Sequence, residues 1–393
     1  MFVINSNEGY FVHLLKSALK NEQPVEKPDE VEWQKVFEIG LMQNAANLVW
    51  FSIEKLNNKP EGELYAQWQE VYAKAASKCF KQMMESEFLA DEFTKRGYDI
   101  LFLKGSKIRE YYPSPDMRTM TDIDLLVKSE EREPVRKIMK ELDYDEDLMD
   151  DGQVDAFKKL PIIYTEIHYD YSNINHAYHD IFSIDWNKLV KTDREHIYEM
   201  TYEDLYFFNF GHYVKNIAKV GIGVRTVLDC YVLWNCASEE QKENILKKFE
   251  NMEFKAFHDN ILKIAHIWFD DMEDDGSLDN AQMYLIETST YGNDKKTQAI
   301  SLINDERNTE SISKTRYILK RIFPGANELY FRFGIKKRII LLLPFLWFAR
   351  MILLIFSGKE KKENIKQNYS IIESLTPEEV EYERLVRKEF GIL

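Results

Sequence analysis

The 393-residue chain lacks several features that would assign it to a common class of protein. Its three cysteines include no CxxC pair, which argues against a disulfide framework and against a cysteine-based zinc site. The N-terminus has no basic start followed by an apolar run, so no secretion signal is predicted. There is no GxxxxGK[ST] pattern, and a P-loop is therefore not supported. Together these absences favour a protein of the reducing cytoplasm.

A positive net charge is also missing, because the chain carries −15 overall and should be repelled by nucleic acid and by anionic membranes. The charge is unevenly distributed, however. Residues 311–366 contain 13 Lys and Arg against three Glu, a net charge of +10. This segment is either a contact surface for an anionic partner, such as a peripheral membrane contact, or simply a solvated helical face.

One long apolar run, residues 339–356, has about the minimum length of a membrane span. Arg350 lies inside the run and Pro344 interrupts it, and an arginine near the middle of a span is costly. Basic residues on both sides also suit a helix at a membrane surface. A buried helical hairpin is the interpretation that we favour, with a surface helix and a true span as alternatives.

The pattern of apolar residues divides the chain into three parts. Residues 1–97 show helical periodicity and form an N-terminal helical lobe. Residues 98–200 mix strand and helix patterns, and residues 201–393 are again mostly helical. We therefore expect an α+β protein with a small mixed-sheet core between two helical domains.

Within the middle part, five segments predict the order β-α-β-α-β. The apolar run 99–103 is typical of a buried strand, and 105–112 suits a short helix. Residues 121–127 predict a second strand, 130–142 a second helix, and 162–171 a strand rich in β-branched and aromatic residues.

The second of these strands opens with Asp122-Ile123-Asp124. Side chains alternate across a strand, so Asp122 and Asp124 share one face while Ile123 points into the core. Two carboxylates this close repel each other unless a cation neutralises them, and oxygen ligands suit magnesium. An acidic pair alone is a weak signal, but this pair is anchored to a buried strand.

A candidate phosphate-binding turn ends the preceding strand at Lys104-Gly105-Ser106. Glycine lets the backbone approach a phosphate closely, the start of the next helix offers N–H groups, and Ser106 adds a hydroxyl donor. Lys104 is adjacent, and Arg118 could clamp a phosphate oxygen. An ordinary strand-to-helix turn is the simpler interpretation of the same residues.

A third acidic residue, Glu166, lies 42 residues beyond Asp124 on another predicted strand, and His168 shares its face. Glu166 would complete a magnesium site for one or two ions, or act as the base on an incoming hydroxyl. His168 would orient this carboxylate. The alternatives are a surface glutamate paired with a lysine and a structural histidine.

These motifs together resemble the polymerase-β-like nucleotidyltransferase superfamily, and more closely a little-characterised bacterial nucleotidyltransferase family within it. That family's pattern LKG…YP.P..R.M.DID.LV is matched by Leu103-Lys104-Gly105, Tyr112-Pro113, Pro115, Arg118, Met120, Asp122-Ile123-Asp124 and Leu126-Val127. Its later acidic strand is similar to Thr165-Glu166-Ile167-His168-Tyr169.

The resemblance continues into the C-terminal half. A pattern H..K…G..R…D is matched by His212, Lys215, Gly223, Arg225 and Asp229, and a last pattern by Arg316-Tyr317, Leu319, Arg321, Phe323-Pro324, Leu342-Leu343-Pro344, Trp347 and Arg350. His212, Arg225 and Asp229 are thereby implied to face the nucleotide or the acceptor. The residue spacing also allows Arg225 and Asp229 simply to pair, four positions apart on a helix.

The resemblance implies transfer of a nucleoside monophosphate from a nucleoside triphosphate, such as ATP, to an acceptor hydroxyl with release of pyrophosphate. The acceptor is a small molecule, a protein or an RNA end. One departure is the gap of 16 residues between Ser106 and Asp122, which the superfamily usually makes shorter. Two alternatives remain open: a catalytically quiet nucleotide-binding scaffold at a membrane surface, and a glycosyltransferase that uses its D-x-D pair to bind a sugar nucleotide.

Overall fold

The computed structural model describes residues 3–149, 154–169, 183–289, 292, 294–306, 319, 322–326, 329, 342–355 and 359–392. The chain divides into two compact units. The first consists of Met1–Ile217, Ile222–Tyr291 and Glu389–Ile392, and the second mainly of Ala218–Gly221 and Gly292–Lys388. The candidate site residues all lie in the first unit.

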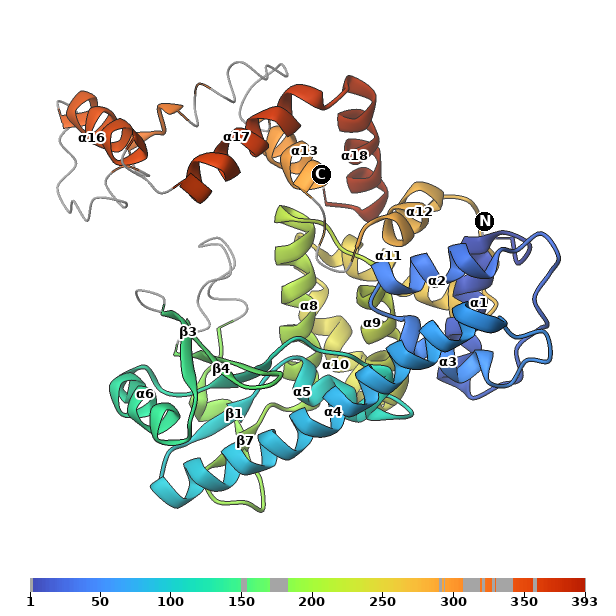
Figure 1. Ribbon diagram of the computed structural model, residues 1–393, viewed down its shortest axis with the longest axis horizontal. Coiled ribbons are helices and arrows are strands. Elements are labelled where there is room, and N and C mark those ends of the chain that lie inside the picture. Colours follow the sequence, from blue (N-terminus) through green and yellow to red (C-terminus); the bar gives the residue numbers. More distant parts are fainter. Residues whose placement is uncertain are drawn as a thin grey trace. The chain divides into compact units, whose positions relative to one another are not determined.

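The first unit begins with the helical lobe that the sequence pattern predicts (Figure 1). Ser6 caps the first helix by accepting a hydrogen bond from the Gly9 amide, and Gly97, with φ 75°, ends the fourth. The helices are α1 (Asn7–Lys20), α2 (Trp33–Met42), α3 (Ala46–Ile53) and the long α4 (Gly62–Arg96).

A seven-stranded mixed sheet follows, in the order β3-β4-β5-β2-β1-β7-β6. The mixed α+β fold expected from the sequence is confirmed. The sheet has seven strands, however, whereas the expected β-α-β-α-β core has three. The strands are β1 (Ile100–Phe102), β2 (Ile123–Leu126), β3 (Asp145–Met149), β4 (Val154–Lys159), β5 (Ile163–His168), β6 (Val190–Lys191) and β7 (Ile197–Glu199). The short α5 (Gly105–Ile108) leads into the 3₁₀ turn η1 (Arg109–Tyr111); η2 (Pro115–Met117), η3 (Ser129–Glu131) and η4 (Trp186–Lys188) are further 3₁₀ turns, and α6 is Arg132–Glu141.

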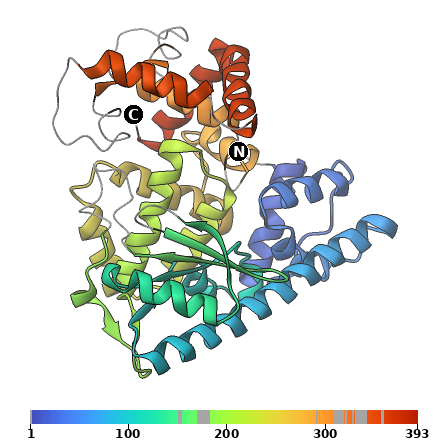
Figure 2. The same cartoon turned by 60° about the vertical axis from the view of Figure 1, so that its left-hand side comes forward.

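One face of the sheet is mostly apolar. Ile123, Leu125 and Ile167 point into a core that also contains Phe93 of α4 and Ile138 of α6. Figure 2 shows α6 lying over the strands. Because side chains alternate along a strand, the neighbouring positions of β2 and β5 project from the opposite face. That opposite face carries the acidic residues of the candidate site.

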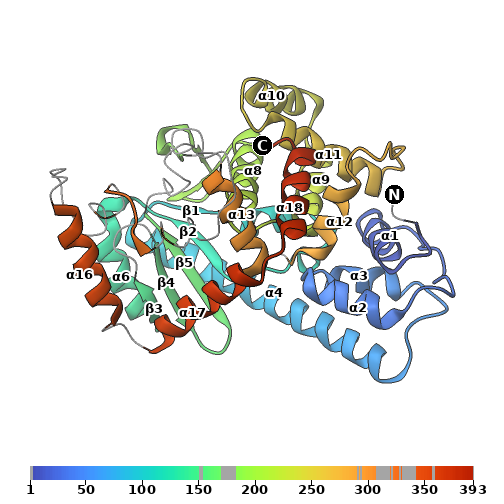
Figure 3. The same cartoon turned by 90° about the horizontal axis from the view of Figure 1, so that it is seen from above.

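Helices complete the first unit beyond the sheet. α11 packs against α9 and against α1, which joins the C-terminal helices to the N-terminal lobe (Figure 3). A capping box at Ser238 and Gln241 starts α10. The helices are α8 (Tyr202–Lys219), α9 (Val224–Cys236), α10 (Glu239–Phe249), α11 (Lys255–Phe269) and α12 (Asp279–Glu287).

The second unit is helical in its described part, with α13 (Asp294–Glu306), α16 (Leu343–Ile355), α17 (Lys359–Ser374) and α18 (Pro377–Phe390). Its small core contains Leu302, Ile303 and Ile372 among others. α13 packs against α17.

The apolar run 339–356 is described over α16 and Leu342, whereas 339–341 and 356 lie outside the described residues. The expected buried hairpin is wrong for this helix, because Phe345 and Phe348 are 71% and 69% exposed. Arg350 donates a hydrogen bond to the Ile322 carbonyl oxygen at 2.7 Å. Within the described part of the chain, no helix combines the length and the apolar character needed to cross a bilayer.

Candidate metal and phosphate site

Two parallel strands bring the acidic residues together. β2 and β5 pair in parallel, with Asp124 directly opposite Glu166 and Leu126 opposite His168. Asp122 lies just before β2, two positions from Asp124. The sheet register therefore gathers, on one face, residues that are more than 40 positions apart in the sequence.

Asp124 is the centre of this group and is only 4% exposed. Its Oδ1 atom lies 2.5 Å from the Lys104 Nζ atom and 2.9 Å from the His168 Nε2 atom. His168 Nε2 is also 3.6 Å from an Oε2 oxygen of Glu166. His168 is thus closer to Asp124 than to the glutamate that it was expected to orient.

Burial and the neighbouring charges shift the pKa of each of the three carboxylates. Burial, followed by the charges of Asp124 and Asp122, raises the pKa of Glu166 to about 7. Burial and the Asp124 charge likewise raise the pKa of Asp122. Burial alone would also raise the pKa of Asp124, but Lys104 and the His168 hydrogen bond outweigh it and hold this pKa well below its usual range.

This arrangement fits a divalent cation. Asp124, Glu166 and His168 each offer a ligand atom, and the three atoms lie within 4.8 Å of one another. Carboxylate oxygens are the ligands that magnesium prefers, whereas an imidazole nitrogen also suits manganese or zinc. A cation would relieve the repulsion that raises the pKa of Glu166. The chemistry of the donor set therefore fits a metal centre, with Asp122 close by.

The turn at Gly105 has no room for a side chain. A Cβ atom there would lie 2.7 Å from the Arg118 Nη1 atom and 3.0 Å from the Met120 Sδ atom. Lys104 before it has φ 45°, a strained value for a residue other than glycine. The glycine thus lets the Arg118–Met120 segment pack directly on the turn, beside the carboxylates.

Ser106 is placed differently from its neighbours Lys104 and Gly105. Its amide donates to the Leu103 carbonyl oxygen at 3.3 Å, within the turn itself. Its hydroxyl lines a separate cavity between α4, β1 and the β6–β7 turn, and none of the three carboxylates is among the described residues lining that cavity. The structure therefore brings Lys104 to the carboxylates but not the Ser106 side chain.

Arg118 is engaged in a buried ion pair rather than directed at the carboxylates. Its Nε and Nη2 atoms each lie 2.8 Å from an oxygen of Asp229, which is fully buried. Tyr112 and Tyr213 donate their hydroxyls to the same carboxylate at 2.7 and 3.0 Å. These contacts fasten the segment before Asp122 to α8 and α9.

Arg225 braces the same segment from α9. Its Nη2 atom donates to the Thr119 hydroxyl at 2.8 Å and to the Asn44 carbonyl oxygen at 3.0 Å, and Nη1 donates to the Thr119 carbonyl oxygen. Burial raises the pKa of Asp229, but the charge and hydrogen bonds of Arg118 lower it. The charge of Arg225 lowers it further, so the pKa lies below its usual value. Arg118, Arg225 and Asp229 thus act together on one loop.

His212 lies on α8, close enough to Lys104 and Asp124 for their charges to act on its pKa. Desolvation lowers its pKa well below the usual range, and the charges of Lys104 and Lys215 lower it further. Asp124 acts in the opposite direction. α8 therefore places an uncharged imidazole near the group formed by Lys104 and Asp124.

Two buried amides also hold the loop, and the sequence patterns did not single them out. Gln82 of α4 donates to the Met120 carbonyl oxygen at 3.2 Å, and Asn47 of α3 donates to the Asp116 carbonyl oxygen at 2.6 Å. Both side chains are buried. The signal that could have found them is a polar residue within the apolar stripe of a predicted helix.

The comparisons with known proteins give one family. The model of a family described as uncharacterised nucleotidyltransferase matches residues 29–270, which contain the sheet, the carboxylates, α8 and α9. No curated protein sequence matches the chain.

Proposed function

Because the chain belongs to the uncharacterised nucleotidyltransferase family, we propose that it transfers a nucleoside monophosphate from a nucleoside triphosphate to an acceptor hydroxyl. In this reaction the acceptor oxygen bonds to the α-phosphorus, the bond from that phosphorus to the oxygen bridging to the β-phosphorus breaks, and pyrophosphate leaves. The hydroxyl proton passes to a base. The proposed reaction depends on a divalent metal, either one ion or two.

The observation that carries the proposal is the register of β2 and β5, which sets Asp124 opposite Glu166 with His168 beside them. Asp122, Asp124 and Glu166 would hold the metal. When bound, magnesium neutralises phosphate charge and orients the donor for in-line attack. A metal at this place is what would allow three crowded carboxylates to be ionised together.

The chain's own residues supply the remaining roles. Without a metal, burial and the neighbouring aspartates raise the pKa of Glu166 to about 7. Glu166 is proposed either to complete the metal site or to accept the proton of the acceptor hydroxyl as a base. His168 holds Asp124 in place through its hydrogen bond. Lys104 and the Gly105 turn are proposed to bind the phosphates of the donor, together with Ser106.

Arg118, Arg225 and Asp229 are proposed to act as positioning residues. Their contacts hold the loop that carries Asp122 and pack it against Gly105, so they fix the carboxylates without touching them. His212 is proposed to face the bound nucleotide from α8. The acceptor is a hydroxyl of a small molecule, a protein or an RNA end, and the cytoplasm is the proposed location.

We further propose that α16 contacts a membrane surface. Its described residues leave Phe345, Phe348 and Leu353 exposed by more than half. The surrounding segment 311–366 carries a net charge of +10. An apolar face inside a basic segment suits an anionic membrane surface.

Equilibrium binding of ATP, and then of the other three nucleoside triphosphates, tests the nucleotide site. Wild-type protein should bind at least one of them in the presence of magnesium and much more weakly in EDTA. Asp124→Asn should abolish the magnesium dependence, because it removes a charged ligand at the centre of the site. Failure of the wild-type protein to bind any of the four would refute the proposed donor site.

A further inference from the structure

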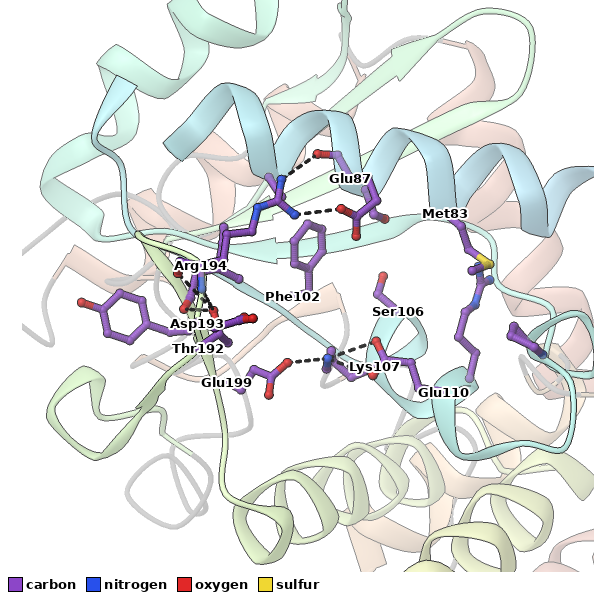
Figure 4. A pocket seen from close by; sticks show the side chains of 16 residues that line it. Met83, Glu87, Phe102, Ser106, Lys107, Glu110, Thr192, Asp193, Arg194 and Glu199 are labelled. Atoms are coloured by element: carbon purple, nitrogen blue, oxygen red, sulfur yellow. Dashed lines mark hydrogen bonds and ion pairs between the residues drawn. The ribbon is translucent and has the colours of Figure 1, made fainter. Parts of the chain in front are cut away.

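The cavity that lies against α4 is not one that α8 helps to form. Residues of α4, β1, α5 and the β6–β7 turn line it, and no described residue of α8 does (Figure 4). Figure 4 shows Lys107 between Glu110 and Glu199, and Arg194 beside Glu87, so these charges neutralise one another. A larger cavity, of about 530 Å³, lies instead against α8 and α10, and we call it the α8 cavity.

Much of the lining of the α8 cavity is apolar. Phe207 and Phe208 of α8 line it, and these two side chains are only 9% and 4% exposed. Leu189, Met200 and Met252 add further apolar surface. A cavity of this size admits a small organic molecule, and walls of this kind favour one with an apolar body.

The charged residues that line the α8 cavity form two ion pairs. Lys248 pairs with Asp204, and the Lys188 Nζ atom lies 3.9 Å from the Asp185 Oδ2 atom. The Lys248 ammonium group also lies over the Phe207 ring, 5.8 Å from its centroid. Two cations and two acids leave no net charge among the described lining residues. The cavity therefore offers little attraction to a polyanion such as an RNA end, and it suits an uncharged molecule.

Helix α8 connects this cavity with the carboxylate site. Phe208 and His212 are four positions apart and so share one face of α8, and their rings meet edge to face with centroids 5.3 Å apart. His212 in turn lies close enough to Lys104 and Asp124 for their charges to act on its pKa. Four residues of a helix span about 6 Å, so a molecule held against Phe208 reaches His212 by extending about one helical turn.

We propose that the α8 cavity binds the acceptor, and that the acceptor is an uncharged small molecule with an apolar body and a hydroxyl. This inference rests on the proposed function, which leaves the acceptor open between a small molecule, a protein and an RNA end. The apolar body packs on Phe207 and Phe208, and the hydroxyl extends along α8 past His212. There its oxygen bonds to the α-phosphorus as pyrophosphate leaves, and its proton passes to the base.

Calorimetric titration with 2-naphthol, a neutral apolar compound that carries a hydroxyl, tests the cavity at pH 7 without nucleotide or magnesium. Wild-type protein should bind one molecule per chain. Met252→Asp should lower the affinity by about tenfold or more, because a carboxylate replaces apolar surface that 2-naphthol would cover. Leu246→Asp is the matched control on α10. Leu246 is 40% exposed and is not among the described lining residues, so the affinity should remain within about twofold.

A second variant and two competitors make the test specific. Met200→Asp, which changes another lining residue, should weaken 2-naphthol binding as Met252→Asp does. A short oligoribonucleotide and a tyrosine-containing peptide should leave 2-naphthol binding unchanged. Displacement of 2-naphthol by either competitor would contradict a small-molecule acceptor. Absence of 2-naphthol binding by wild type, or equal binding by wild type and both variants, would overturn the proposal.

Nucleotide binding separates this inference from the proposed function. Met252→Asp should bind nucleoside triphosphate and magnesium as wild type does, because Met252 lines the α8 cavity and not the carboxylate site. In label transfer to 2-naphthol, this variant should raise the KM for 2-naphthol and leave the KM for the nucleotide nearly unchanged. Nucleotide binding without 2-naphthol binding would overturn the acceptor cavity alone. Binding of 2-naphthol without binding of any nucleotide would instead contradict the proposed transfer, and with it the acceptor role of the cavity.

Discussion

At the scale of single residues, the candidate site depends on which charges the fold brings together. Asp124, Glu166, His168 and Lys104 were all singled out from sequence patterns, and the structure places their charged atoms within a few ångströms of one another. The alternation of a strand and the pairing of two strands account for this result. These are local rules, so the sequence is informative here.

The partner of Arg118 is the contrasting case. Arg225 and Asp229 are four positions apart, which made their mutual pairing a simple expectation. In the structure Asp229 instead receives two hydrogen bonds from Arg118, which is 111 positions away. No local pattern indicates such a pair, because it arises only when α9 packs against the loop before Asp122.

The buried pair gives a prediction at this scale. Asp229→Asn should lower the free energy of unfolding by about 3–5 kcal/mol, because Arg118 then remains buried without a counter-charge. Urea unfolding at neutral pH measures this loss. An Arg118→Met/Asp229→Leu double variant serves as the control and should recover much of the stability; a single variant as stable as wild type would contradict the role assigned to the pair.

At the scale of elements, the long helix α4 shows how far a periodic pattern can be trusted. The periodicity of residues 62–97, with Trp68, Cys79, Met83 and Phe88 on one apolar stripe, predicts this helix. α4 has nearly these bounds, and Trp68 and Cys79 are buried, but the rest of the stripe leaves the buried face. Met83 and Phe88, expected on that stripe, are 44% and 38% exposed, whereas Gln82 and Leu89 are buried. The Phe88 ring packs under the Lys159 ammonium group at 4.6 Å, an environment that residue type alone does not reveal.

The additional strands were missed for a physical reason. β4 contains Asp155, which is fully buried and so interrupts the apolar alternation of a strand. The charge is satisfied by Arg132 and Arg136 of α6, at 2.8 and 2.7 Å. β6 and β7, with two and three residues, are too short to show a period. Tertiary contacts, rather than local sequence, define these strands.

The helix pair α8 and α11 gives a pH prediction. His258 of α11 is fully buried, stacks on Phe249 with ring centroids 4.0 Å apart, and contacts the Tyr206 hydroxyl at 3.1 Å. Burial lowers its pKa from 6.5 to about 4. Between these values the unfolded chain binds the proton and the folded chain does not, so stability falls as the pH is lowered from 6.5 towards 4.

The expected loss between pH 7 and pH 5 is about 2 kcal/mol, part of the total of about 3 kcal/mol that corresponds to lowering the pKa to about 4. Urea midpoints of wild type and His258→Gln, compared at pH 7 and at pH 5, measure it. The variant should lose less stability than wild type on acidification. His266→Gln on the same helix controls for the loss of an imidazole; equal pH dependence of wild type and His258→Gln would exclude His258 as the cause.

At the scale of the whole molecule, the charge is divided between segments: the basic segment 311–366 contrasts with an otherwise acidic chain. This segment includes α16, whose exposed apolar residues no periodic pattern could distinguish from core residues. The apolar sequence of α16 predicts that its side chains are buried in a core or in a membrane. Only the packing of α16 shows which of these side chains are exposed.

Membrane attachment is the prediction that belongs to this scale. The protein should co-sediment with anionic phosphatidylglycerol vesicles and not with neutral phosphatidylcholine vesicles. Phe345→Ser/Phe348→Ser should reduce that binding by about tenfold or more, because two apolar side chains no longer insert. Phe80→Ser changes an equally exposed phenylalanine of α4 and should have no effect. Equal binding by both variants would rule out α16 as the contact.

The central claim is that Asp122, Asp124 and Glu166 form a metal-dependent nucleotidyl-transfer site. It is tested most directly by incubating the protein with each of the four α-labelled nucleoside triphosphates, magnesium and candidate acceptors, and measuring label transfer and pyrophosphate release. We predict transfer from at least one nucleotide, no transfer in EDTA, and none by Asp122→Asn/Asp124→Asn protein. Transfer that persists in the double variant would contradict the account.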